Sequence, residues 1–163
     1  MGGPIGIPNI ERFDRGELVI DMEDRRKSVF LKEVAEEPFA KLLGIRLKNV
    51  GEGYALCEME YTERMDNIYG MAHGGAIFAL IDEAFEISSN SHDNIAVALN
   101  INVTYMMPPE KNTILTAESR EINRTRKTAS YQITVRNNQN LIAVCQALVY
   151  IKDQHNPFRR NIK

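Results

Sequence analysis

Residues 67–87 read NIYGMAHGGAIFALIDEAFEI, and this segment contains the clearest structural signal of the chain. Its second part, residues 75–87, is longer than an ordinary strand and has apolar side chains on nearly every side, which predicts a helix buried almost all round. The polar run Asn90-Ser91-His92-Asp93-Asn94 is predicted to end this helix. The rest of the chain must supply the surface that covers it.

Short apolar runs on both sides of the predicted helix are typical of strands. Residues 45–50 and 54–61 precede it, with Gly51-Glu52-Gly53 as a three-residue hairpin loop, and residues 96–106, 113–121, 129–136 and 141–151 follow it. Val97, Leu99 and Ile101 alternate with polar or small residues, which is the period of a strand. The order predicts an α+β fold in which one antiparallel sheet wraps a central helix.

The chain before this region is predicted to be an extension. Residues 1–37 are rich in charges of both signs, and Ser28 is a candidate cap for a short helix that Pro38 ends or restarts. Gly44 is expected to close the next turn. We therefore predict a partly helical N-terminal extension, residues 1–37, and one domain, residues 38–163.

Composition narrows the class of function. The chain has 163 residues, which favours a single domain, and its formal charge of −2 provides no general attraction for nucleic acid. Cys57 and Cys145 are far apart in the sequence, so we expect two core thiols rather than a zinc or redox pair. No stretch approaches the length of a membrane span, and no signal segment is evident; we expect no membrane partner and a cytoplasmic location.

The start of the predicted helix is the candidate site for chemistry. Unpaired amides at a helix N-terminus attract negative charge, and Gly74 and Gly75 let a substrate carbonyl come close to theirs. The side-chain amide of Asn67 is a second donor, or alternatively caps a turn. His73, beside the glycines, suits a backbone-bonding or packing role better than that of a general base.

Two acidic residues in the helix are candidates for the catalytic carboxylate. Asp82 lies seven residues after Gly75, and therefore on the same helical face, whereas Glu83 points about 100° away. A carboxylate in an apolar helix is costly unless it has a partner or borders a site. We rank Asp82 ahead of Glu83, for which an ion pair is the alternative.

These residues resemble the hotdog-fold acyl-CoA thioesterases, in the subgroup of the phenylacetyl-CoA thioesterase-like proteins. The resemblance extends over residues 38–151 and rests on Asn67, His73-Gly74-Gly75, Asp82 and the run Asn102-Val103-Thr104-Tyr105. It implies a six-stranded sheet around the helix and a homodimer that shares its active sites, with which a dimer of dimers is compatible. It also implies that Gly74 and Asn67 bind the thioester oxygen and that Asp82 of the other subunit acts as general base or nucleophile. The products are a carboxylic acid and free CoA.

One position departs from the pattern of the family. Some relatives have a hydroxyl residue where this chain has Ala98, and Asn100, two residues further, is expected to lie on the same face and replace it. The resemblance also places basic residues near the CoA phosphates, here Arg124, Arg126 and Lys127, and implies neither a metal nor a redox cofactor. A non-catalytic acyl-CoA-binding protein is the second hypothesis, and a hotdog dehydratase or hydratase ranks last.

Overall fold

The computed structural model describes residues 11–12, 18–19 and 22–159. From residue 38 onward the elements are, in chain order, α2 (Pro38–Leu43), β3 (Arg46–Gly51), β4 (Tyr54–Tyr61), the 3-10 turn η1 (Glu63–Met65), α3 (Gly74–Ser89), β5 (Asn94–Tyr105), β6 (Thr113–Arg124), β7 (Thr128–Asn137), β8 (Asn140–His155) and the 3-10 turn η2 (Pro157–Arg159). Before them come β1 (Glu11–Arg12), β2 (Leu18–Val19) and α1 (Met22–Glu36).

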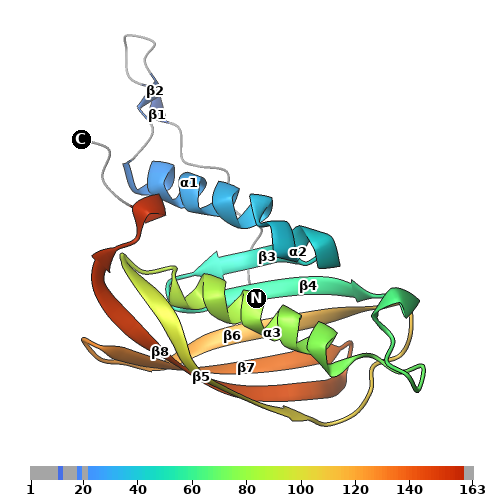
Figure 1. Ribbon diagram of the computed structural model, residues 1–163. Helices are drawn as coiled ribbons and strands as arrows, with labels where there is room; N and C mark the ends of the chain where they lie inside the picture. Colours follow the sequence, from blue (N-terminus) through green and yellow to red (C-terminus); the bar gives the residue numbers. More distant parts are fainter. Residues whose placement is uncertain (1–10, 13–17, 20–21, 160–163) are drawn as a thin grey trace.

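The main sheet has six antiparallel strands in the order β3-β4-β6-β7-β8-β5. The sheet curves around α3, which lies along its concave face (Figure 1). This is the hotdog architecture expected from the sequence. The predicted six strands and central helix are confirmed, and α3 is one residue longer at its start and two at its end than the apolar run indicated.

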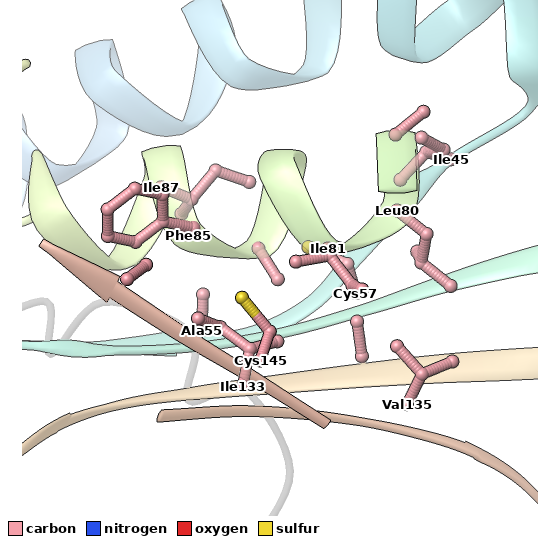
Figure 2. Packing of buried hydrophobic residues seen from close by; sticks show 14 of the residues in the cluster. Ile45, Ala55, Cys57, Leu80, Ile81, Phe85, Ile87, Ile133, Val135 and Cys145 are labelled. Atoms are coloured by element: carbon pink, nitrogen blue, oxygen red, sulfur yellow. The ribbon is translucent and has the colours of Figure 1, made fainter. Parts of the chain in front are cut away.

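The core lies between α3 and the sheet because the helix offers apolar side chains on most of its surface. Leu80, Ile81 and Ala84 are fully buried, and the ring of Phe85 meets that of Tyr131 edge to face with centroids 5.4 Å apart. Cys57 and Cys145 lie in the same cluster as free thiols (Figure 2). Burial raises the pKa of both thiols, that of Cys145 to about 11, so the expectation of two core cysteines is confirmed.

The hairpin between β3 and β4 turns more tightly than the sequence indicated. Gly51 pairs with Tyr54, so the loop of the first hairpin has the two residues Glu52 and Gly53, and the predicted three-residue loop is wrong. Gly53 adopts φ +66°, which makes this short turn possible. Gly44 ends α2 in the left-handed conformation, as predicted.

The N-terminal part contains more regular structure than expected. Helix α1 begins at Met22, so Ser28 lies inside the helix and the prediction that it caps the helix is wrong. Residues 11–12 and 18–19 form a small two-stranded ladder. Helices α1 and α2 lie over α3 on the side away from the sheet (Figure 2), and η2 lies beside α1 (Figure 1). The division of the chain at residue 38 stays a prediction.

Strand β5 forms one edge of the sheet and contains an irregularity that its sequence conceals. Ala98 pairs with Val149 and Asn100 with Leu148, so two steps along β5 match one step along β8. This β-bulge leaves Leu99 without a partner and 57% exposed. Among the described residues, no helix is long and apolar enough to cross a bilayer.

Candidate active site

The first turn of α3 is shaped by His73. This residue is the N-cap, and its Nδ1 accepts a hydrogen bond from the Gly75 amide at 2.9 Å. A Cβ atom on residue 75 would lie 2.9 Å from that nitrogen, so glycine allows the ring to reach the helix start. The imidazole is thus engaged in capping, which agrees with the structural role favoured from the sequence.

The backbone N–H of the neighbouring residue, Gly74, takes no part in this capping. Within the described ranges, no hydrogen bond uses the Gly74 N–H, although the same residue's carbonyl accepts one from Tyr105 Oη at 3.0 Å. A Cβ atom at position 74 would touch the Tyr105 ring at 3.4 Å. The Gly74 amide therefore stands at the positive end of the α3 dipole with no intramolecular acceptor.

Asn67 combines the two roles that the sequence left open. Its Oδ1 accepts hydrogen bonds from the amides of Tyr69, at 2.8 Å, and Met71, at 3.3 Å, so the side chain closes the loop before the helix. In the part of the chain that the structure describes, Nδ2 has no acceptor. Fixing the oxygen also fixes the amide plane, and Nδ2 is thereby held as an oriented donor.

The loop that carries Asn67 is anchored to the sheet. The Tyr61 hydroxyl donates to Asp66 Oδ1, and Lys111 Nζ lies 2.7 Å from Asp66 Oδ2. The His73 amide donates to the Met65 carbonyl at 2.8 Å. These contacts lock the approach to α3, so both donors belong to one rigid segment.

Asp82 lies two turns into α3 and is half-buried. Burial raises the pKa of its carboxyl, which makes it a stronger base than a surface aspartate. No hydrogen bond or ion pair to another described residue holds this carboxyl. Asp82 is thus a basic group that the described structure leaves available for a ligand.

Glu83, the alternative carboxylate, has a different environment. It is 6% exposed, and burial first, then the charges of Glu37 and Glu86 and a hydrogen bond with Glu37, raises its pKa to about 8. Its side chain is thus paired with the residue that precedes α2. Nothing in the sequence indicated Glu37, because the pairing joins residues far apart in the chain.

The expectation for Asn100 rested on unbroken alternation along β5 and is wrong in that respect. Paired residues in an antiparallel ladder point to the same face, so Ala98 shares the inner face of Val149 while Asn100 shares the outer face of Leu148. The bulge at Leu99 separates them. Beyond it, Tyr105 returns to the inner face, opposite Ala143, and reaches Gly74. Sequence reasoning included Tyr105 in the family motif but predicted no role for it, although an inward aromatic residue at a strand end was a usable signal.

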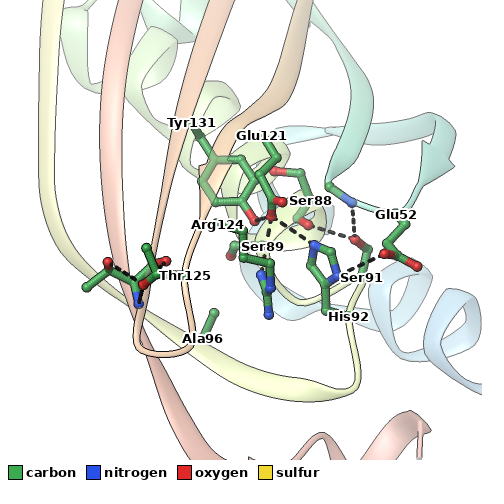
Figure 3. A network of polar contacts seen from close by, with 12 residues as sticks. Glu52, Ser88, Ser89, Ser91, His92, Ala96, Glu121, Arg124, Thr125 and Tyr131 are labelled. Atoms are coloured by element: carbon green, nitrogen blue, oxygen red, sulfur yellow. Dashed lines mark hydrogen bonds and ion pairs between the residues drawn. The ribbon is translucent and has the colours of Figure 1, made fainter.

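The three residues expected near CoA lie at the β6–β7 turn, in different surroundings. Arg124 Nη1 is 3.2 Å from Glu121 Oε2, an oxygen that also meets Tyr131 Oη at 2.6 Å and His92 Nε2 at 2.9 Å (Figure 3). Burial would raise the pKa of Glu121, but these three partners together lower it. Arg124 thus balances a partly buried carboxylate.

The other two basic residues of the turn share one acid. Lys127 makes an ion pair with Asp153, and Arg126 lies 4.0 Å from the same carboxylate with its side chain 82% exposed. Arg126 is therefore the most accessible of the three predicted cations. Its contact with Asp153 is at the surface, where such pairs contribute little.

Comparisons with known proteins agree with this geometry. A sequence model of the thioesterase superfamily matches residues 69–144. A putative esterase of Archaeoglobus fulgidus is 40% identical over 111 residues, 68% of this chain and 72% of that protein. The acyl-coenzyme A thioesterase PaaI of Escherichia coli is 34% identical over 100 residues, 61% of this chain and 71% of that protein.

Solved structures share the fold. The structure of the E. coli PaaI protein covers 83% of this chain and 99% of its own, with a TM-score of 0.76 and 26% identity. A phenylacetic acid degradation protein of Thermus thermophilus covers 70% of this chain and 98% of its own, with a TM-score of 0.68 and 32% identity. The match to the family model spans α3, with the Gly74 amide at its start, and the strands β5, β6 and β7. This chain belongs to the thioesterase superfamily.

Proposed function

We propose that this thioesterase hydrolyses acyl-CoA esters at a site shared between two copies of the chain. The Gly74 amide and Asn67 Nδ2 of one copy polarise the thioester carbonyl, and Asp82 of the other copy activates water or attacks the carbonyl itself. The acyl carbon gains an oxygen and the C–S bond breaks. The CoA sulfur leaves as a thiolate and takes up a proton, so the products are a carboxylic acid and CoA.

The observation that carries this proposal is the pair of unused donors in front of α3. Amide groups without an acceptor at a helix start stabilise the negative oxygen that forms when a carbonyl is attacked. The Gly75 amide already donates to His73 Nδ1, so the Gly74 amide is the one available to the substrate oxygen. The proposed chemistry requires water and protein groups, with no metal or redox cofactor.

The need for a second copy follows from distance. Asp82 lies eight residues after Gly74 in one continuous helix, so about 12 Å separates them along the axis. A reacting carbonyl needs its donors and its attacking group each about 3 Å away. One chain therefore does not bring its own Gly74 and Asp82 to the same carbonyl.

Strand β5 is the proposed contact between the copies. It is an edge strand of 12 residues, and a long unpaired edge readily pairs with another chain. Leu99 and Tyr105 are exposed on it, and Tyr105 also contacts Gly74. Antiparallel pairing of two β5 strands would bring the helix start of one copy toward the helix of the other. A dimer of dimers remains compatible with this contact.

The phosphate end of CoA needs positive charge on the protein. CoA carries phosphates, and the chain as a whole has a formal charge of −2, so binding requires a local cation. Arg126 is the first candidate because its side chain is free in water apart from the contact with Asp153. Lys127 and Arg124 contribute to the same turn.

Two variants test the chemistry. Asn67→Asp keeps the oxygen that closes the loop but removes the Nδ2 donor, and we expect a loss of about 10²- to 10³-fold in kcat. Asp82→Asn keeps the shape but removes the base, and we expect about 10²- to 10⁴-fold. Release of the CoA thiol is followed with a thiol-trapping dye. Parent-like rates in both purified variants would refute these roles, while saturable CoA-ester binding by an inactive parent would favour the non-catalytic hypothesis.

Mixing the two variants tests whether the site is shared. A mixed dimer combines one damaged site with one site made of intact Asn67 and intact Asp82 from different copies. After unfolding and refolding of a 1:1 mixture, we expect about a quarter of parental activity, since half of the dimers are mixed and each regains one of two sites. Each variant refolded alone is the control. No regain in mixed dimers, or a fully active monomer by light scattering, would contradict the shared site.

A further inference from the structure

A half-open cavity of about 630 Å³ lies at the C-terminal end of α3, between parts of the chain that are distant in sequence. Helix α1, the end of α3, the start of β5 and the segment around η2 all contribute to it. Its apolar lining includes Phe30, Val34, Ile87, Ile95, Val97 and Phe158. Its size lies within the range of about 300–1,000 Å³ that is typical of small-molecule sites.

The polar residues of this cavity hold its walls in place. Asn90 bonds the end of α3 to β5 in both directions, its Oδ1 accepting from the Ala96 amide at 3.0 Å and its Nδ2 donating to the Ala96 carbonyl at 3.2 Å. Asn156, which is 3% exposed, donates from Nδ2 to the Asn90 carbonyl at 3.0 Å. The two asparagines thus join the end of α3, the start of β5 and the segment before η2, so hydrogen bonds hold these walls of the cavity in place.

The cavity continues from the proposed catalytic acid. Glu86, which lines it, follows Asp82 by four residues and therefore lies on the same face of α3. Asn90, which also lines it, is the C-cap of the helix. One helical turn, about 5.4 Å, leads from Asp82 to the nearest wall. A thioester carbonyl held at Asp82 thus has the cavity within reach of its acyl chain.

The charge of the cavity lining favours the acyl end of an acyl-CoA over its phosphate end. Four carboxylic acids, Glu33, Glu36, Glu37 and Glu86, line the cavity, and no lysine or arginine does so among the described residues. Glu36 is ion-paired with Lys41, but the phosphates of CoA would still meet the like charges of the other acids in this space. An uncharged acyl chain meets apolar side chains instead.

We propose, on the basis of the function proposed above, that this cavity binds the acyl group, and that its carboxylic acids select uncharged acyl chains over chains ending in a carboxylate. Helix α1, which lies outside the matched family region, supplies one wall. The N-terminal part of the chain therefore contributes to substrate choice as well as to covering α3.

The test compares three esters: acetyl-CoA, hexanoyl-CoA and adipoyl-CoA, whose six-carbon chain ends in a carboxylate. For the parent we expect kcat/KM for hexanoyl-CoA to exceed that for adipoyl-CoA at least about tenfold. Val34→Trp fills the cavity from α1 and should lower kcat/KM for hexanoyl-CoA at least about tenfold while leaving acetyl-CoA within about twofold. The matched control is Val29→Trp, on the same helix but outside the lining.

A smaller side chain guards against misfolding of the tryptophan variant. Val34→Ala enlarges the cavity and should raise the preference for decanoyl-CoA over hexanoyl-CoA about threefold or more. The double variant Glu33→Gln/Glu36→Gln should lower the hexanoyl-to-adipoyl ratio about threefold or more. If the parent is active but these ratios do not move, the acyl pocket is elsewhere. If the parent releases no thiol from any ester, the proposed function itself fails, and the pocket with it.

Discussion

Replacing Glu83 with glutamine should stabilise the protein, and the difference in stability between this variant and the parent should grow as the pH rises. The buried Glu83 carboxyl has a pKa of about 8 in the folded chain, above its ordinary value of 4.5, chiefly because burial disfavours its charge and because Glu37 lies beside it. Between these two values the folded state keeps a proton that the unfolded state releases. The free energy of unfolding of the parent must therefore fall as the pH rises through this window.

The size of the effect follows from the same two values. A difference of 3.5 in pKa, from 4.5 to about 8, corresponds to at most about 5 kcal/mol. Relaxation and water entry around a buried charge reduce the penalty, and we expect about 2–3 kcal/mol. Glu83→Gln keeps the volume and a hydrogen-bonding group for Glu37 but has no charge to bury. Its Tm should exceed that of the parent by ~5–10 °C at pH 9 and by much less at pH 5.

Thermal unfolding followed by circular dichroism at fixed protein concentration, from pH 5 to pH 9, measures this difference. Glu110→Gln is the control, because it removes one carboxylate from an exposed position and should leave the difference from the parent independent of pH. Parallel Tm curves for the parent and Glu83→Gln would refute the reasoning, since they would show that Glu83 is charged in the folded protein at pH 7 or that its charge is well solvated.

Three further predictions concern the site and its support. The acid limb of the pH dependence of kcat/KM should have its midpoint above the ordinary aspartate pKa of 3.8, because burial raises the pKa of Asp82. This limb should be absent from the residual activity of Asp82→Asn. A midpoint at or below 3.8 in the parent would argue against Asp82 as the base. Tyr105→Phe removes the hydrogen bond to the Gly74 carbonyl, worth about 1 kcal/mol, and should lower kcat about fivefold with little change in KM; an unchanged kcat would mean that the helix start needs no such support. Gly53→Ala places a Cβ atom 2.8 Å from Glu121 Cβ at φ +66° and should cost about 2–3 kcal/mol in urea unfolding; a loss below about 0.5 kcal/mol would show that the turn relaxes easily.

The central helix could be predicted from the sequence because its signal is local. Residues 75–87 contain too many apolar side chains for a surface helix, and the flanking runs have the period of strands, so the layer order follows from simple packing. The candidate donors were predicted for the same reason. Gly74 is the first residue of the helix and Asn67 lies in the loop that leads to it, and the unpaired amides of a helix start are a property of any helix.

The features that were missed depend on contacts between distant residues. The bulge at Leu99 arises from the pairing of β5 with β8. Apolar residues alternate along the sequence of β5 as they would in a regular strand, so the sequence does not reveal the bulge. Likewise, the partner of Glu83 is Glu37, and the partner of Arg124 is Glu121 within a cluster that also contains His92. A single sequence shows which residues carry charge, but the fold decides which charges meet.

The two adjacent carboxyls of α3 acquire different roles through the same property of the helix. Because α3 is buried on most sides, both Asp82 and Glu83 have raised pKa values, yet only Glu83 has another carboxyl to share a proton with. At neutral pH Glu83 is therefore largely protonated, and it adds little negative charge beside Asp82. A permanently charged neighbour would raise the pKa of Asp82 further and oppose the negative charge that forms on the substrate oxygen. The pairing of Glu83 with Glu37 thus helps Asp82 to remain ionised, and it links the N-terminal helices to the chemistry of the site.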